Sequence, residues 1–254
     1  MTLDPAALLR TERYGRSFVS LAETGSTNDA ARTAALGGAP NGHVVSAEQQ
    51  LQGRGSNGRA WSSPPGLDLF VSIVDRPAIA LPQLPPLTLA VGLGVAQAVD
   101  ALLRASPAQV KWPNDVLLHG KKCAGILVEA STSGVTVESL VIGIGLNVNR
   151  LEFEPELREI ATSLRAERPG HAELDRAQVL AQLLASVEAQ VDRFVALGPS
   201  VIVAELARRL ALIGQRARCG DVFGVVLGVS PGGALLMRTE TGVRELHAGR
   251  LLPA

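Results

Sequence analysis

Lysine and cysteine are scarce in this sequence of 254 residues, and neither sign of charge is in excess. The 24 basic residues balance 24 acidic ones, which excludes the strong positive field that draws a protein onto nucleic acid or an anionic membrane. The two cysteines, Cys123 and Cys219, form no CxxC or Cys/His pattern, so we expect reduced thiols and a cytoplasmic protein. No apolar run approaches the roughly 18 residues of a membrane span, and none at the start resembles a signal peptide. We therefore expect a chain without a membrane segment.

The few lysines lie in one short window. They are Lys111, Lys121 and Lys122, whereas the other 21 of the 24 basic residues are arginines spread along the chain. If arginine replaces lysine wherever charge alone is needed, the remaining lysines mark positions that require a compact ammonium group. Chance clustering of a rare residue is the alternative. Asparagine is also rare, and four of its six positions fall in the segments discussed below: Asn28, Asn114, Asn147 and Asn149.

The first half of the chain alternates helical and strand-like patterns. Helices are predicted over 5–14 and 28–36, the second after a Gly-Ser-Thr-Asn run suited to a helix N-cap. Residues 44–48 and 69–74 have strand character, and the polar, glycine-rich segment between them is predicted as a loop. The apolar stretch over 85–105 predicts a long buried helix packed under a sheet.

The second half is predicted to contain more strands, then two helices, and finally a β-rich segment. Helical periodicity returns over 176–197 and 199–212. Short β-rich pieces with glycine turns follow, and they indicate a small barrel. We place the boundary near 209–214, which gives domains 1–210 and 211–254. Five strands are predicted between the long helix over 85–105 and the helix over 176–197, and together they indicate a mostly antiparallel or mixed sheet. They are 109–111, 116–118, 124–129, 135–138 and 140–144.

Three segments carry residues suited to chemistry. The loop over 53–59 interleaves glycines, which let the backbone approach a ligand, with arginines that bind carboxylate or phosphate. The segment 111–129 combines Asn114 and Asp115, which could hold Mg²⁺ and a nucleotide, with the lysine pair before a buried strand. The alternative for the first segment is a flexible connector without a function, and the alternative for the second is a hairpin whose basic tip is solvated. The glycines over 143–149 are not followed by a helical pattern, so a dinucleotide fold is not indicated.

These segments, taken together and in this order, resemble the biotin protein ligase family, also called biotin–acetyl-CoA-carboxylase ligase. The resemblance spans roughly residues 20–150, with a weaker match in the C-terminal barrel. It implies an α+β fold: a mixed β-sheet with flanking helices, like the catalytic domain of class II aminoacyl-tRNA synthetases, followed by a small SH3-like β-barrel. The matching pieces are GSTN at 25–28, AEQQLQGRGSNGRAWSSPPG at 47–66, KWPND with KKCAGILVE at 111–129, and GIGLNVN at 143–149.

The same resemblance implies roles for individual residues. Arg54 and Lys122 are the catalytic pair, and Gln50 reaches the region of the biotin ureido ring. Residues assigned to biotin are Ser26, Thr27, Asn28, Gln50, Arg54, Gly55, Ser56, Lys122 and Gly125. Residues assigned to ATP are Arg54, Arg59, Trp61, Lys111, Asn114, Asp115 and Asn147, with Asp115 as a ligand of Mg²⁺.

The implied reaction brings two anions together. A carboxylate and the α-phosphate of ATP must meet, so Arg54, Lys122 and Mg²⁺ are expected to screen their repulsion while biotinyl-AMP forms. A lysine on a biotin carboxyl carrier domain, the acetyl-CoA carboxylase subunit, then takes the acyl group. No enzyme nucleophile is needed, in agreement with the absence of a Ser/His/Asp or Cys/His constellation.

The sequence departs from the family at two places. The family loop usually reads GRGRxGR, and Ser56 stands here in place of the second arginine, so biotinyl-AMP is expected to be retained less tightly. Some members carry an N-terminal winged helix that binds DNA. The first motif begins here at residue 25, so we expect no such domain and no nucleic-acid partner.

Two other functions compete with this one. A lipoate or octanoate protein ligase shares the fold and the acyl-adenylate logic, but the GRGxxGRxW loop with KWPND favours biotin. A non-enzymatic biotin-binding module would need neither ATP nor a lysine, and the lysine cluster speaks against it. The sequence leaves the oligomeric state open, with a homodimer among the outcomes.

Overall fold

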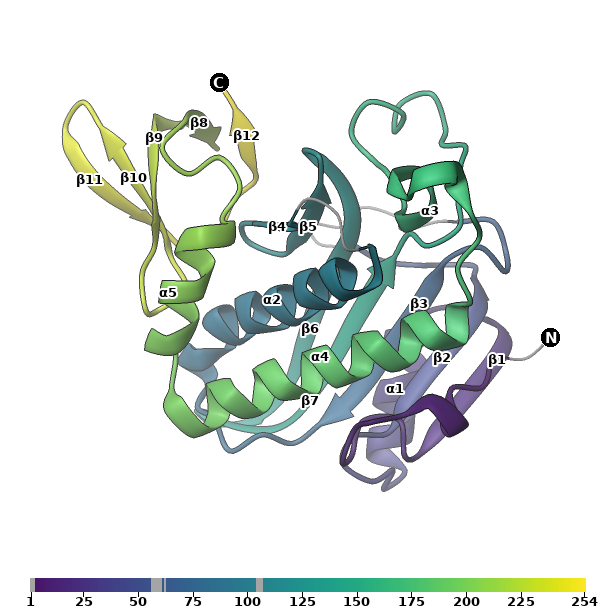
Figure 1. Cartoon of the computed structure of the whole chain (residues 1–254). Coiled ribbons are helices and arrows are strands. Elements are labelled where there is room, and N and C mark those ends of the chain that lie inside the picture. Colours follow the sequence, from purple (N-terminus) through teal and green to yellow (C-terminus); the bar gives the residue numbers. More distant parts are fainter. Residues whose placement is uncertain (1–2, 56–60, 62, 104–106) are drawn as a thin grey trace.

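The computed structural model describes residues 3–55, 61, 63–103 and 107–254 (Figure 1). Its larger sheet has seven strands: β1 (Phe18–Thr24), β2 (Val44–Gln50), β3 (Leu69–Asp75), β4 (Gln109–Lys111), β5 (Asp115–Leu118), β6 (Lys121–Ser133) and β7 (Thr136–Leu146). Their order across the sheet is β1-β2-β3-β7-β6-β5-β4. Only β1 and β2 pair in parallel, and every other neighbouring pair is antiparallel. The expected mixed sheet is therefore confirmed.

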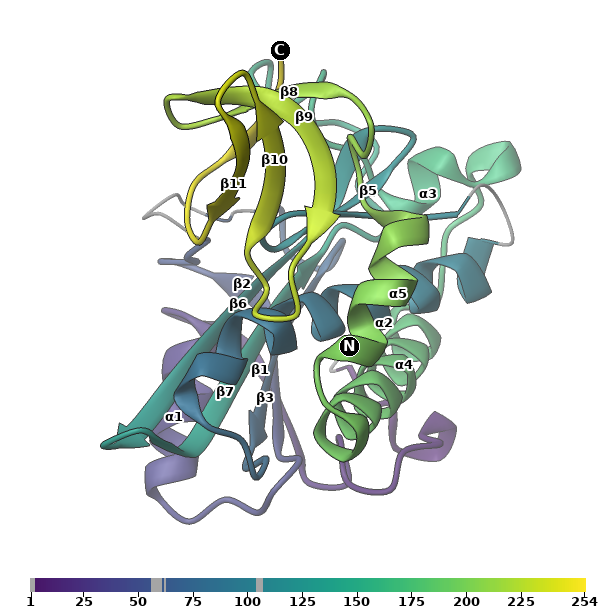
Figure 2. The same cartoon turned by 90° about the vertical axis from the view of Figure 1, so that its left-hand side faces the viewer.

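The helices divide between the two faces of this sheet (Figures 1 and 2). α2 (Leu84–Leu103) and α4 (Arg176–Leu197) pack together over one face, and α1 (Thr27–Leu36) packs against β2, β3 and β7 on the opposite face. The other helices among the described residues are α3 (Leu164–Glu167), α5 (Ser200–Arg209) and the short 3₁₀ segments η1 (Ala6–Leu8), η3 (Leu81–Gln83) and η4 (Pro169–His171).

Alternation along the strands sends side chains to two different environments. On β3, Leu69, Val71 and Ile73 join the main core beneath α2 and α4, whereas Val74 joins a small cluster beneath α1. Because successive strand residues point to opposite faces, Phe70 and Ser72 also belong to the α1 face. α1 covers only part of that face, and the uncovered part is available for a binding site.

The long helix predicted over 85–105 is present as α2, and it forms the centre of the core. By length and composition alone its segment, Leu81–Leu103, could cross a membrane, so the expectation that no run reaches that length is wrong. In the folded chain 67% of that window is buried. Its apolar surface is therefore used to pack this domain together.

The N-terminal segment differs from the prediction. Instead of a helix over 5–14 it contains only the single turn η1. The backbone N–H groups of Glu12, Arg13 and Tyr14 donate to the carboxylate of Glu188 on α4, at 2.8–2.9 Å. Because these donors are satisfied by a distant side chain, the segment does not need a helix to pair them. The strand β1 that follows was not predicted, since its burial does not alternate.

The C-terminal segment folds into a five-stranded antiparallel sheet, as expected of the small barrel. Its strands are β8 (Arg216–Cys219), β9 (Val222–Val229), β10 (Leu235–Thr239), β11 (Gly242–Leu246) and β12 (Leu251–Pro253), in the order β11-β10-β9-β8-β12. The indole Nε1 of Trp112 donates to the carbonyl of Gly233 at 2.9 Å in a buried contact, which ties this sheet to the segment 111–129 of the larger domain. The exact domain boundary at residues 210 and 211 stays a prediction.

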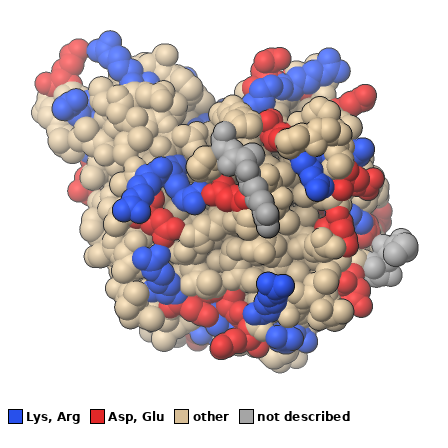
Figure 3. Space-filling view, viewed as in Figure 1, with Lys and Arg blue, Asp and Glu red and all other residues tan. Residues whose placement is uncertain are grey.

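Charge is mixed over the molecular surface. Figure 3 shows acidic and basic side chains interspersed on the viewed face, without a large patch of one sign there. This distribution agrees with the equal numbers of acidic and basic residues.

Candidate functional site

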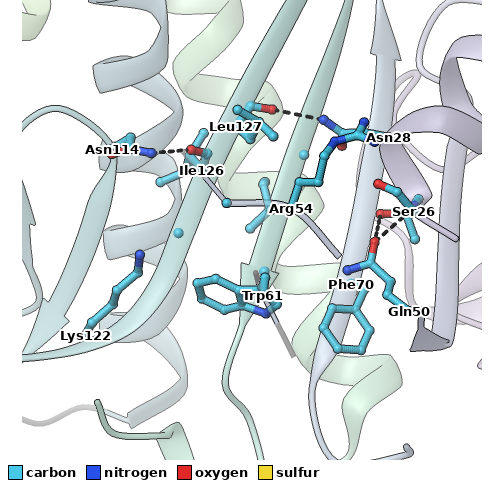
Figure 4. Close-up of a pocket in the computed structure, with 16 residues that line it drawn as sticks. Ser26, Asn28, Gln50, Arg54, Trp61, Phe70, Asn114, Lys122, Ile126 and Leu127 are labelled. Atoms are coloured by element: carbon cyan, nitrogen blue, oxygen red, sulfur yellow. Dashed lines mark hydrogen bonds between the residues drawn. The ribbon is translucent and has the colours of Figure 1, made fainter. Parts of the chain in front are cut away.

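A cavity lies on the α1 face of the seven-stranded sheet, beside the N-terminus of α1 (Figure 4). Its floor follows the pairing of three strands: Gly145 of β7 stands opposite Phe70 of β3 on one side and Gly125 of β6 on the other. Gly143 occupies the same face two residues earlier. The residues that line the cavity are Ser26, Thr27, Asn28, Gln50, Arg54, Gly55, Trp61, Phe70, Asn114, Lys122, Gly125, Ile126, Leu127, Gly143, Ile144 and Gly145.

One end of the cavity is formed by neutral polar side chains. Gln50 Oε1 accepts hydrogen bonds from the backbone N–H and the hydroxyl of Thr27, at 2.8 and 3.1 Å. The carboxamide is thereby oriented, and Figure 4 shows its nitrogen turned toward the cavity. Ser26 is the N-cap of α1, yet its side chain makes no capping hydrogen bond although the residue is only 4% exposed. Its hydroxyl is therefore left to a ligand.

Asn28 is held rigidly between two elements. The hydroxyl of Ser72, which is fully buried, donates to Asn28 Oδ1 at 2.6 Å, and Asn28 Nδ2 donates to Glu129 Oε2 at 2.6 Å. A Cβ on Gly143 would lie 2.2 Å from Asn28 Oδ1, so only glycine leaves room for this side chain. The packing of α1 on the sheet thus depends on a missing side chain in β7.

The other end of the cavity carries a positive charge. Lys122, at the start of β6, forms an ion pair with Asp115 on the neighbouring strand, with 2.5 Å between Nζ and Oδ1. Its ammonium also lies 5.0 Å from the centre of the Trp61 ring. Asn114 is fixed by a hydrogen bond from Nδ2 to the carbonyl of Ile126, at 2.7 Å. Figure 4 shows Lys122 and Asn114 on the side opposite Gln50 and Ser26.

Arg54 approaches the cavity from the segment that follows β2. Its two terminal nitrogens each donate to one oxygen of Asp29 on α1, both at 2.7 Å. The hydrogen bonds that Arg54 donates lower the pKa of Asp29, and the same contact raises the pKa of Arg54. Arg54 and Lys122 therefore line one shared cavity, with Arg54 paired to a carboxylate at its rim.

Trp61 lies across the floor between the two ends. A Cβ on Gly145 would fall 2.4 Å from its ring, and one on Gly125 would fall 2.8 Å from it, so both glycines are needed for the indole to lie flat on the sheet. The indole Nε1 is buried and has no hydrogen-bond partner among the described residues. A ligand that enters the cavity meets this unused donor.

The indole covers the floor of the cavity, which encloses about 430 Å³ when space open to solvent is included. A ligand that reaches the backbone of Gly125 or Gly145 therefore requires Trp61 to shift.

The structure brings together most of the residues predicted for the site. Three described ones do not line the cavity. Asn147 is buried, and its Nδ2 donates to the carbonyl of Thr162 at 2.9 Å. Lys111 stands opposite Asp115 in the register of β4 and β5, and the carboxylate of Asp115 forms its ion pair with Lys122. Ser56 and Arg59 lie outside the described residues, so their assignment is unaffected by the geometry.

Sequence reasoning did not assign several residues of the floor. The segment 143–149 was among the matching motifs, but its glycines were given no role. The unassigned residues that line the cavity are Phe70, Ile126, Leu127, Gly143, Ile144 and Gly145. The spacing of two between Gly143 and Gly145 was a usable signal, because glycines at alternate strand positions empty one face of a sheet.

The side chains offer no preformed metal centre. Within the part of the chain that the structure describes, no group of three or more His, Cys, Asp or Glu residues is placed to hold a metal ion. Asp115 is a single carboxylate engaged by a lysine.

Comparison with known proteins agrees with the fold. The pattern of the biotin/lipoate A/B protein ligase family matches residues 22–147. The bifunctional ligase/repressor BirA of Bacillus subtilis is 33% identical over 246 residues, which cover 94% of this chain and 75% of that protein. The biotin–[acetyl-CoA-carboxylase] ligase of Mycobacterium tuberculosis is 36% identical over 236 residues, covering 87% of this chain and 83% of that one.

Solved structures give the same result. The biotin protein ligase from Aquifex aeolicus in complex with biotin and ATP superposes with a TM-score of 0.80 at 28% identity, covering 93% of this chain and 97% of that one. The fold and these matches define an enzyme of the ligase class. Within that class, the chain belongs to the biotin protein ligase family.

Proposed function

We propose that this enzyme uses ATP to activate the carboxylate of biotin and then transfers the biotinyl group to a lysine of a carrier protein. The observation that carries the proposal is the polarity of one cavity: neutral amide and hydroxyl groups at one end, and the ammonium of Lys122 at the other. Such an arrangement suits a neutral bicyclic head group that is followed by an apolar chain and a terminal acid.

The head-group end fits a cyclic urea. Ser26 and Gln50 keep hydrogen-bonding capacity within the cavity, and Phe70 supplies apolar surface beside them. Lipoate carries a dithiolane ring without comparable hydrogen-bonding groups, so buried amides and hydroxyls would stay unpaired around it. The biotin ligases among the relatives support the same preference.

The acid end fits the activation step. A carboxylate oxygen of biotin attacks the α-phosphorus of ATP, the bond to the β,γ-diphosphate breaks, and biotinyl-AMP and pyrophosphate form. Lys122 and Arg54 both line this cavity, and their positive charges reduce the repulsion between the two anions as they meet. Asn114, which is fixed by its hydrogen bond to Ile126, lines the same cavity and is assigned to the nucleotide.

The second step requires a protein substrate. The neutral amine of an acceptor lysine attacks the acyl carbon, the bond to AMP breaks, and the amine loses one proton as the amide forms. The relatives named for acetyl-CoA carboxylase support a biotin carboxyl carrier domain as the acceptor.

Magnesium is best treated as part of the nucleotide substrate. Asp115 pairs with Lys122 and does not line the cavity, and the described residues contain no cluster of metal ligands. The side chains therefore do not fit a magnesium site built by the protein alone, and we derive no step through Asp115. Mg²⁺ commonly enters such sites bound to phosphates and water.

The decisive experiment is isotope exchange between pyrophosphate and ATP. Exchange that depends on added biotin, and that is far slower with lipoate, is the expected result. A following incubation with a carrier domain should place the label of radioactive biotin on that domain. Exchange with lipoate equal to that with biotin would contradict the substrate assignment, and biotin binding without any exchange would indicate a binding module.

A further inference from the structure

Four charged side chains form a closed ring at the rim of the cavity. Arg54 donates two hydrogen bonds to Asp29, and Arg32, one turn along α1, donates to the same carboxylate at 2.9 Å. Arg32 also forms an ion pair with Glu129 on β6 at 2.9 Å, and Glu129 Oε2 lies 4.0 Å from Arg54. The ring is joined to the site because Asn28 donates to Glu129.

The ring contributes little to the stability of the fold. The side chains of Asp29 and Arg54 are 46% and 41% exposed, and ion pairs between such solvated charges add little to the free energy of unfolding. Neither residue belongs to the hydrophobic core. The main effect of the ring is therefore on the position of Arg54.

The contact with Asp29 leaves part of the guanidinium unused. An arginine has five N–H groups in one plane, and Asp29 takes one from each terminal nitrogen. The Nε–H and the N–H of the terminal nitrogen beside it remain, and these two form a second edge that can bind another oxyanion. The mutual pKa shifts keep both groups charged at neutral pH. Arg54 can therefore bind Asp29 and a substrate anion at once.

We propose that Asp29 is a positioning residue for the activation step, acting through Arg54. Its carboxylate orders the arginine at the rim of the cavity before the substrate anion arrives. An ordered side chain loses less conformational freedom on binding, which is worth about 0.5–1.5 kcal/mol for a long side chain. The inference rests on the proposed function, because it assigns the second edge of Arg54 to biotin or to the nucleotide phosphate.

The test measures biotin-dependent pyrophosphate exchange in the full chain. The variants are Asp29→Asn, Arg54→Ala and the double variant, with Asp29→Glu as the conservative rescue. Glu205→Gln is the matched control. Glu205 forms a comparable ion pair with Arg193, with 2.7 Å between the charged atoms, and neither residue lines the cavity. We expect Asp29→Asn to lower kcat/KM by about three- to tenfold, which corresponds to the ordering free energy above.

Three results support the inference together. Asp29→Asn leaves the thermal unfolding midpoint unchanged, Asp29→Glu restores most of the activity, and Asp29→Asn causes no further loss when Arg54 is already alanine. A purely structural role for Asp29 would not give this non-additivity.

Other results overturn it. Unchanged or increased kcat/KM in Asp29→Asn would show that the carboxylate is idle or competes with the substrate. An equal loss in the presence and absence of the Arg54 side chain would show that Asp29 does not act through it. These outcomes leave the proposed function intact, whereas a wild-type protein without biotin-dependent exchange would defeat the proposed function and the inference with it.

Discussion

The ammonium nitrogen of Lys122 lies 2.5 Å from the carboxylate oxygen of Asp115, which is carried by the neighbouring strand β5. The pair is largely buried, since the two side chains are 26% and 16% exposed. A lysine placed in this way keeps its charge at a fixed position and needs little reorganisation when an anion approaches. Asp115 therefore affects the cavity through Lys122, although it does not line the cavity itself.

Replacing Lys122 by alanine is expected to lower the rate of biotin-dependent pyrophosphate exchange by about a hundredfold or more, because a charge directed at the reacting oxygens is lost. Lys121→Ala provides the neighbouring control, since Lys121 donates to the carbonyl of Arg158 and does not line the cavity. Equal losses in the two variants would show that the effect is not specific to the cavity.

Gly143→Ala is expected to weaken biotin binding by at least tenfold. The added methyl group would fall 2.2 Å from Asn28 Oδ1, and Asn28 cannot easily yield because Ser72 and Glu129 hold it. Overpacking of this kind costs about 1–3 kcal/mol. Calorimetric titration with biotin measures the effect. Gly232→Ala is the control, because the nearest atom to its added Cβ is 3.7 Å away, and wild-type affinity in Gly143→Ala would contradict the described floor.

Binding of biotin and ATP is expected to change the tryptophan fluorescence through Trp61 alone. The chain has two tryptophans, and Trp112 is 2% exposed with its Nε1 bonded to Gly233, away from the ligand space. Trp61 lies across the floor of the cavity, so a ligand there contacts its ring, and its buried Nε1 would gain a partner. The ligand-induced change should disappear in Trp61→Phe and persist in Trp112→Phe. The reverse pattern would place the ligand elsewhere.

The buried carboxyl of Asp75 predicts a pH dependence of stability. Asp75 is 1% exposed, and burial raises its pKa in spite of a hydrogen bond from Tyr14 and the nearby charge of Arg13. The folded state therefore binds this proton more tightly than the unfolded chain, whose aspartate pKa is about 3.9. The resulting stabilisation is complete below that value and is lost as pH rises through the folded-state pKa.

Urea unfolding of the wild type and of Asp75→Asn at a series of pH values isolates this effect. The free energy of unfolding of the wild type should fall relative to that of the variant as pH rises from about 4 through the raised pKa. A difference that stays constant over this range would mean that Asp75 titrates alike in the folded and unfolded chain.

Ser56→Arg is expected to slow the dissociation of biotinyl-AMP, as the comparison of the loop with its family suggests. A charged hydrogen bond is worth about 1.5–3 kcal/mol, so the rate should fall by up to about a hundredfold. Release of the labelled adenylate from a preformed complex gives the rate directly. A dissociation rate equal to that of the wild type would show that the residue at position 56 does not affect how tightly biotinyl-AMP is held.

Several elements could be predicted because their signals are local. The helix over 176–197 matches α4 residue for residue, since Asp175 caps its first turn with a 2.8 Å hydrogen bond and Gly198 ends it with a positive φ of 78°. The segment over 5–14 also contains apolar residues, but the distant Glu188 binds its backbone, and no local pattern reveals that contact.

Within the site the same division holds. The sequence shows, in order, the kinds of residue that form the site: a polar helix cap, a glycine–arginine loop, a lysine before a strand and a glycine-rich strand. The structure decided which of them share a space. Asn147 belongs to the same motif as the floor glycines, yet its amide is used by Thr162, while Phe70 lies in no motif and lines the cavity.

The sequence by itself therefore determined most of the elements, the family and the kinds of chemical group that this enzyme brings to an acid and a phosphate. Only the tertiary structure decided that Gly125, Gly145 and Phe70 stand side by side, that Asp115 holds Lys122, and that Asp29 holds Arg54. The reason is physical. Caps, turns and periodicity act over a few residues, whereas strand register and ion pairing depend on which distant segments the core brings together.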